Sequence, residues 1–346
     1  MVSFRVAFLT FAALSLAACA SVSLSPPASP QETPAQLHPS TVSVTAGLTR
    51  YLDQRARVER VGFRLRRAAA ETCSKRGQTK PDVGVIVWSL ANFPNGDDRA
   101  YLQQKFALTD AVTVALAVEG APGEKAGLRA GAIVTHVNDD AVLEGKGATE
   151  RFIALSNAAA KDGPVRLRLA DKRTLAIKPQ PVCEFPTLLV RSAEVNAAAD
   201  GRVLAITTGL FELTRSDDEL ALILGHELSH NVLGHLEQLA AKNKPGILDA
   251  FVRATIGTAV ASTVNQPFSP ENEREADYVG LYLMARAGFD IDAADAFWRR
   301  LNEMTKANAV ATTHPSGPDR LKAIKATIAE IKAKQKAKQP LDPDPR

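Results

Sequence analysis

The stretch LGHELSH at residues 224–230 constrains this chain more than any other segment. His226 and His230 are four residues apart, and Glu227 lies between them. On an α-helix this spacing places both imidazoles on one face, one turn apart, so that both can reach the same cation. Glu227 then projects beside the cation without having to be one of its ligands. The pattern predicts a metal site inside a helix.

The residues around the motif predict where this helix begins and how far it runs. Ser216 and Glu219 have the spacing of a capping box, and the early acids and late lysine favour a helix over 217–242. On a continuous helix His235 lies about 140° round the axis from His230. We therefore expect His235 to stay outside the metal site.

The third ligand has to come from another segment. Leu233 and Leu236 occupy the positions at which a metzincin carries glycine and histidine, so that class is excluded. The alternative is a glutamate on a second helix, as in zinc sites with two histidines and one glutamate. Residues 268–288 predict such a helix. Its start and stop signals are Ser269 as N-cap, Pro270 in the first turn and Gly288 after the last turn.

Glu273 is the carboxylate that this second helix turns inward. It shares a face with Asp277 and with small and apolar side chains, which predicts burial of that face. We predict Glu273 as the third ligand and Asp277 as the acceptor for the free ring N–H of a ligating histidine. An acidic turn alone would be solvated surface, so the assignment depends on this phasing. The side chains expected to point away are Glu271, Glu275, Tyr278 and Tyr282.

HELSH followed by EREAD is similar to zinc metallopeptidase family forty-eight, the family of the CAAX prenyl proteases, HtpX and BepA. Residues 195–227 resemble the family's strand and the entry to its active-site helix, and residues 313–321 resemble its later His-Pro segment. The resemblance covers about residues 181–330, with residues 48–90 as an N-terminal part. It implies an α+β fold, in which a mainly helical zincin-type protease domain includes a small sheet.

The resemblance also implies the chemistry of the site. One zinc ion per chain would be held by His226, His230 and Glu273, and Glu227 would be the catalytic base. Residues 203–213 are expected to form an edge strand that holds an extended substrate beside the zinc. The sequence identifies no oxyanion-stabilising residue.

Two further segments have open roles. His314 precedes Pro315 in a loop, where it either reaches the zinc and restrains activity or is an ordinary surface histidine. Residues 247–264 are apolar but contain Asp249 and Arg253, so we expect a helix that packs beside the cleft, with contact to a bilayer surface as the alternative.

An inserted PDZ-like domain is predicted at residues 98–180. Residues 118–142 resemble the turn, short helix and strand of a PDZ domain, and residues 148–157 the helix beside its peptide groove. Residues 164–170 and 173–179 alternate as paired strands do. PDZ domains bind extended peptides by strand addition, so the unit either binds peptide termini or is a spacer without a ligand.

The start of the chain predicts export. Residues 6–18 are an apolar run too short to span a membrane, and Leu16–Cys19 resemble a bacterial lipobox, which implies lipidation of Cys19 and an outer-membrane anchor. Ordinary cleavage after Ala20 is the alternative. Because an oxidising compartment favours disulfides, we expect Cys73 and Cys183 to pair across the two ends of the insertion, against the alternative of two buried free thiols.

Composition and charge limit the partners. The chain has 346 residues, with 42 basic against 38 acidic residues and 5% aromatic residues, and no basic block precedes a lysine-rich tail after Lys332. Nucleic acid is therefore not an expected partner. A helix over 48–76 and a buried strand over 83–90 are predicted before the insertion. The expected division is a signal peptide at 1–18, a disordered tether at 19–47, protease domain at 48–97, PDZ-like domain at 98–180, peptidase domain at 181–333 and a disordered tail at 334–346.

These features predict an exported, lipid-anchored zinc endopeptidase of the periplasm that cuts misfolded or envelope proteins. The first alternative is a chaperone-like scaffold with a structural or latent zinc site and peptide binding by the PDZ-like unit. Glu227 argues against it, since a structural site has no need for a base. The second alternative is a zinc hydrolase of another bond, such as an amide of the cell wall.

Overall fold

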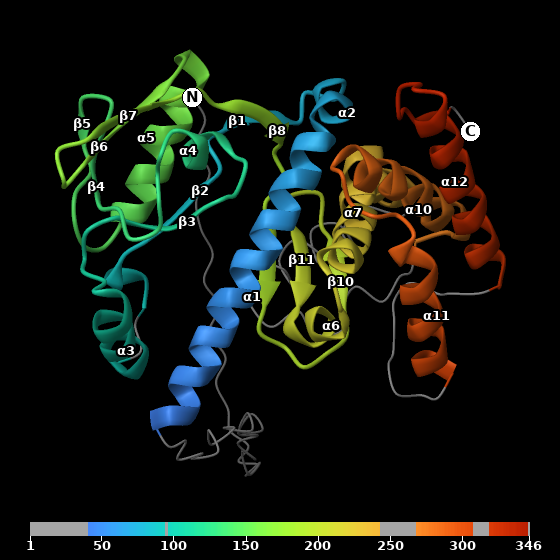
Figure 1. Cartoon of the computed structure of the whole chain (residues 1–346), viewed down its shortest axis with the longest axis horizontal. Coiled ribbons are helices and arrows are strands. Elements are labelled where there is room, and N and C mark those ends of the chain that lie inside the picture. Colours follow the sequence, from blue (N-terminus) through green and yellow to red (C-terminus); the bar gives the residue numbers. More distant parts are fainter. Residues whose placement is uncertain (1–40, 94–95, 243–267, 307–317, 345–346) are drawn as a thin grey trace, which may run out of the picture. The chain divides into compact units, whose positions relative to one another are not determined.

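The computed structural model describes residues 41–93, 96–242, 268–306 and 318–344 (Figure 1). Its helices are α1 (Thr41–Ala68), α2 (Ala70–Ser74), η1 (Leu90–Asn92), α3 (Gly96–Phe106), α4 (Pro122–Lys125), α5 (Ala148–Asp162), α6 (Thr208–Leu213), α7 (Asp217–Leu233), α8 (His235–Lys242), α10 (Pro270–Arg286), α11 (Ala293–Lys306) and α12 (Pro318–Lys336). Its strands are β1 (Thr79–Asp82), β2 (Val85–Trp88), β3 (Thr113–Ala117), β4 (Val134–Val137), β5 (Asp140–Ala141), β6 (Val165–Leu169), β7 (Thr174–Ile177), β8 (Gln180–Cys183), β9 (Thr187–Val190), β10 (Ala197–Ala199) and β11 (Leu204–Thr207). The mixture agrees with an α+β fold.

The first core is built from α1, α7, α10, α11 and α12 together with a three-stranded sheet. In that sheet β11 is the middle strand, antiparallel to β10 and parallel to β9. The prediction of an edge strand over 203–213 is therefore wrong. The strand ends at Thr207 because its side chain caps α6, accepting a hydrogen bond from the Leu210 backbone N–H. Of the described strands, β10 is the one that lies at the sheet edge and next to α7.

The second core contains β4, β6, β7 and α5, and the antiparallel strands β2 and β3 lie beside them. β6 pairs with β7 from Val165 opposite Ile177 to Arg168 opposite Thr174, as the alternation of these segments predicts. Val83 also packs into this core, and Val85 and Val87 pack against it, so the unit begins before residue 98. β2 is half-buried rather than buried.

A short ladder and a disulfide join the two ends of this unit. β1 pairs antiparallel with β8, and Thr79 lies opposite Cys183. A disulfide links Cys73 to Cys183, with 5.5 Å between their Cα atoms. The chain therefore leaves the first core and returns to it at one point.

The N-terminal helix starts earlier and ends sooner than the sequence predicts. α1 begins at Thr41, inside the segment expected to be a tether, and gives way to α2 after Ala68 instead of running to residue 76. Arginines of α1 bind groups of the first core. Arg57 pairs with Asp217, and Arg64 donates a 2.8 Å hydrogen bond to the Ala287 carbonyl.

The C-terminal segment is also ordered where a disordered tail was expected. α12 continues to Lys336, and the residues after it fold back onto α10 and α12. Arg286 donates to the Leu341 carbonyl at 2.7 Å, and the Asp344 backbone N–H donates to the Tyr278 hydroxyl at 3.0 Å. Leu341 packs against the first core, and Lys334 pairs with Asp344 at 2.7 Å.

Several sequence predictions lie outside the described residues. They are the signal peptide at 1–18, Cys19, the tether up to residue 40, the apolar stretch 247–264 and His314. Within the described part of the chain, every helix is too short or too polar to span a bilayer.

Candidate metal centre

Two glycines allow α7 and α10 to cross closely enough to form one site. A Cβ atom on Gly280 would lie 3.1 Å from the carbonyl carbon of Gly225 and from the backbone nitrogen of His226. A Cβ atom on Gly225 would lie 3.2 Å from the Gly280 carbonyl oxygen. These distances to backbone are tighter than ordinary packing, so larger residues would push the helices apart. The crossing sets the histidines of α7 against the carboxylates of α10.

His226, His230 and Glu273 converge from these two helices, and all three are buried. The two Nε2 atoms are 3.1 Å apart, and each lies 3.5 Å from a carboxylate oxygen of Glu273. Tetrahedral zinc with bonds of about 2.1 Å keeps its ligand atoms about 3.4 Å apart. The triangle therefore fits a zinc ion, and its nitrogen and oxygen donors are of the type that zinc binds with a fourth position open.

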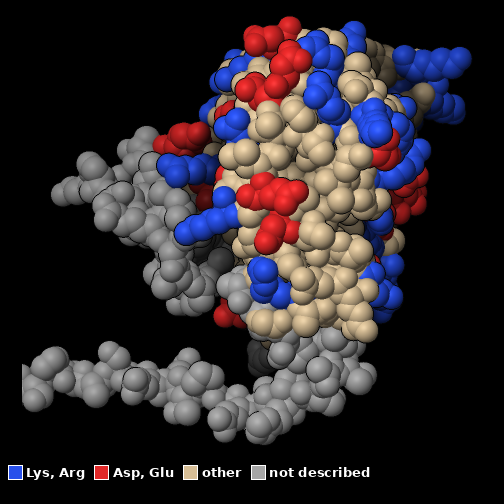
Figure 2. Space-filling view, turned by 90° about the vertical axis from the view of Figure 1, so that its left-hand side faces the viewer, with Lys and Arg blue, Asp and Glu red and all other residues tan. Residues whose placement is uncertain are grey.

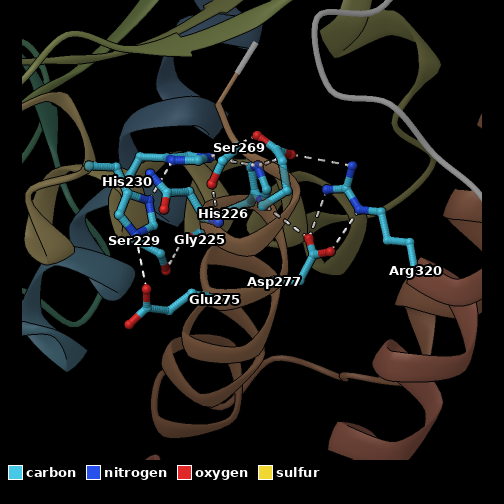
Figure 3. A network of polar contacts seen from close by, with 11 residues as sticks. Gly225, His226, Ser229, His230, Ser269, Glu275, Asp277 and Arg320 are labelled. Carbon is cyan, nitrogen blue, oxygen red and sulfur yellow. Dashed lines mark hydrogen bonds and ion pairs between the residues drawn. The ribbon is translucent and has the colours of Figure 1, made fainter. Parts of the chain in front are cut away.

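Asp277 and Arg320 support the first histidine (Figure 3). The Asp277 carboxylate accepts a 2.9 Å hydrogen bond from His226 Nδ1, and Arg320 donates two more at 2.7 and 2.8 Å. Burial raises the pKa of Asp277, but the positive charges of Arg320 and His226 outweigh burial and hold it below its usual value. Burial lowers the pKa of His226, but hydrogen bonds and charges from Asp277 and Glu273 outweigh it and raise the pKa to about 10. The site therefore stabilises positive charge.

A different pair of residues contacts the second histidine. His230 Nδ1 lies 2.9 Å from Nδ1 of His235, and His235 Nε2 lies 3.2 Å from a carboxylate oxygen of Glu275. The expectation that His235 stays away is wrong, because α7 ends at Leu233 and Gly234 adopts a left-handed conformation with φ of 70°. Burial is the main cause that lowers the pKa of His235.

Glu227 lines a pocket that opens beside His226. The other walls are apolar side chains from α6, α7 and α11, together with the start of β10. They include Leu210, Ile223, Phe297, Trp298 and Leu301. Among the described residues Glu227 is the one carboxylate that lines this pocket, which therefore offers apolar contact next to a potential base.

The structure agrees with much of the predicted geometry and corrects part of it. Ser216 and Ser269 cap α7 and α10, and Glu273 and Asp277 face α7. Tyr278 and Tyr282 point away from α7, as the sequence predicts, but they do not reach solvent. Both are buried and donate hydrogen bonds to Glu330 of α12, because that helix covers the face of α10 turned away from α7.

Sequence reasoning missed Arg320 and the roles of His235 and Glu275. Arg320 is separated from Asp277 by 43 positions, so no local spacing reveals the pair. The glycine at 234 was the available signal for His235, since glycine often ends a helix in the left-handed conformation.

Comparison with known proteins shows which family this region of the chain resembles. Residues 167–328 match peptidase family M48. These findings support a metallopeptidase of that family. Mitochondrial metalloendopeptidase OMA1 of Schizosaccharomyces pombe is 30% identical over 177 residues, which cover 47% of this chain and 52% of the relative. OMA1 of Arabidopsis thaliana is 34% identical over 149 residues, covering 40% of this chain and 31% of the relative.

Bacterial relatives match a similar share of the chain. The beta-barrel assembly-enhancing protease of Escherichia coli strain K12 is 27% identical over 160 residues, covering 40% of this chain and 33% of the relative. The matched part of the chain thus spans 31–52% of the length of these relatives. The names of the relatives support metalloendopeptidase activity.

Proposed function

We propose that this protein is a zinc-dependent endopeptidase that cleaves unfolded or misfolded proteins of the cell envelope. The observation that carries the proposal is the buried triangle of His226, His230 and Glu273, with Glu227 at the adjoining pocket. Two histidines and one glutamate, with no fourth protein donor among the described residues, suit catalytic rather than structural zinc.

The residues of the site divide the work of hydrolysis. A bound zinc ion supplies Lewis acidity, which polarises a carbonyl and lowers the pKa of water. Glu227 takes the proton of the attacking water and passes it to the leaving amine. Asp277, held by Arg320, keeps the His226 ring oriented through its Nδ1.

The pocket and the neighbouring sheet edge support an extended polypeptide as substrate. β10 offers a free strand edge among the described strands, and its first residue, Ala197, lines the pocket. A substrate strand beside β10 would direct alternate side chains towards α7. Because the pocket is walled mainly by apolar groups, an apolar side chain next to the scissile bond is favoured over a charged one, whose desolvation costs free energy. Such segments are exposed in unfolded proteins.

We further propose that the chain acts in the periplasm, anchored through lipidated Cys19. The signal-like start of the sequence and the relatives named beta-barrel assembly-enhancing proteases support this placement. We also propose that the PDZ-like unit binds peptide termini. Its exposed apolar side chains support a ligand role, since Leu143 is 62% and Ile153 51% exposed. Figure 2 shows this side of the molecule, with a broad central area of other residues around an acidic cluster and with charged residues at the top and along the right-hand edge.

The test compares cleavage of an unfolded protein by the full chain and by Glu227→Gln at equal zinc occupancy. Loss of cleavage with zinc retained is expected, because the amide cannot accept the proton. Glu184→Gln is the matched control. Glu184 is exposed and lies more than 40 residues before Glu227 in the sequence, so this variant should cleave normally. If zinc-loaded wild type leaves polypeptide uncut, the endopeptidase proposal is refuted in favour of a scaffold or a hydrolase of another bond.

A further inference from the structure

The His230 ring is held on two sides by groups that lie outside the zinc triangle. Phe268 stacks on it, with 3.9 Å between ring centroids and 16° between planes. His235 contacts its Nδ1 edge at 2.9 Å and is itself fully buried. Glu275 contacts the far nitrogen of His235 at 3.2 Å from a half-exposed position on α10.

With a cation bound at Nε2 of His230, hydrogen-bond chemistry permits one consistent arrangement of protons along this chain of three residues. The lone pair of Nε2, the ring nitrogen that faces Glu273, then binds the cation, and the ring proton lies on Nδ1. That N–H donates to His235 Nδ1, which leaves the proton of His235 on Nε2. His235 then donates to the Glu275 carboxylate, which accepts only.

The local backbone is built to bring His235 to this place. Gly234 breaks the helix at φ of 70°, a conformation that costs little for glycine and more for other residues. A Cβ atom there would also lie 2.5 Å from the Arg76 guanidinium. The turn places His235 on the side of α7 that carries His230. A continuous helix would place His235 on another side.

We propose that His235 and Glu275 are positioning residues that fix the ring orientation and tautomer of the zinc ligand His230. This inference rests on the proposed zinc site and extends it. The two ligating histidines are thereby supported differently. His226 donates directly to a carboxylate paired with arginine, whereas His230 donates to a neutral imidazole backed by a carboxylate near solvent.

The test measures zinc affinity by competition with a chromophoric chelator, together with the free energy of unfolding in excess chelator. His235→Ala should weaken zinc binding by about 10–100-fold, the range for removing a group that orients a metal ligand. His235→Asn should recover much of this loss, because its side-chain oxygen can replace the Nδ1 acceptor. Glu275→Gln keeps an acceptor without the charge and should lose only a few-fold. His136→Ala, in β4, is the matched control and should bind zinc normally.

The two readouts separate a positioning role from a structural one. A structural role would lower the unfolding free energy of His235→Ala and His235→Asn in chelator while leaving the zinc affinity of the folded fraction unchanged. If wild type binds zinc and both variants bind it within two-fold of wild type, the inference is overturned and the proposed function stands. If the wild-type protein itself fails to bind zinc, both the proposed function and this inference are refuted.

Discussion

Asp277→Ala should destabilise the fold by about 3–5 kcal/mol, because the buried Arg320 guanidinium loses the carboxylate that accepts two of its hydrogen bonds and retains Glu273 at 3.5 Å. Asp277 is 6% and Arg320 7% exposed, and hydrogen bonds of 2.7 and 2.8 Å join them. Arg320→Ala should cost a similar amount, since it leaves the carboxylate buried beside Glu273. Independent effects would sum to about 6–10 kcal/mol. The double variant leaves neither charge of the pair unmatched, so we expect a loss of only about 3–5 kcal/mol and a large coupling energy.

The assay is urea denaturation of the full chain and the three variants in excess chelator, so that metal binding does not contribute. Fluorescence of Trp298 reports on the first core, and the Arg320 guanidinium lies 3.8 Å from its ring, so each variant needs its own baselines. Lys332→Ala breaks the exposed ion pair with Asp292 and serves as the control, with an expected change of about 0–1 kcal/mol. Additive losses in the double variant would refute the reasoning, because they would show that the two charges do not depend on each other.

Three further predictions concern the disulfide, the helix crossing and pH. Replacing both Cys73 and Cys183 by serine should lower the free energy of unfolding, measured by urea denaturation, by up to about 4.8 kcal/mol. This is the chain-entropy value for a disulfide between residues 110 positions apart. An unchanged free energy of unfolding would show that the disulfide does not stabilise by restricting the unfolded chain. Gly280→Ala should weaken zinc binding, as measured by competition with a chelator, because the added methyl group overpacks the crossing and moves α10 away from Gly225. The overpacking should cost about 1–3 kcal/mol. An unchanged zinc affinity would mean that the helix crossing can relax. In chelator, stability should fall as pH rises from about 6.5 to about 10. The pKa of His226 is raised to about 10 in the folded state, so its contribution is complete below its unfolded value of about 6.5 and disappears as pH passes 10. The loss should be absent in His226→Gln, and an equal slope in that variant would contradict the assignment.

Local patterns in the sequence were sufficient for the ligands of the candidate site. The four-residue spacing of His226 and His230 fixes their common face on any α-helix, and the apolar stripe around Glu273 fixes which carboxylate turns inward. The helix caps at Ser216 and Ser269 were predictable for the same reason, since a cap bonds to a backbone N–H three residues on. Strand order was not predictable. The segment 203–213 reads as one strand, and only the bond from Leu210 to Thr207 divides it.

The sequence by itself determined the donor set of the candidate metal site, because that depends on residue types at helical spacing. The tertiary structure decided how each ligand is supported. Arg320 reaches Asp277 from a helix 43 positions away, and His235 reaches His230 only because Gly234 interrupts the helix. Glu275 seemed to point away on its own helix, yet the turn after α7 brings His235 to it. Contacts of this kind depend on how helices cross and end, and the crossing of α7 and α10 at two glycines leaves no periodic signal in the sequence.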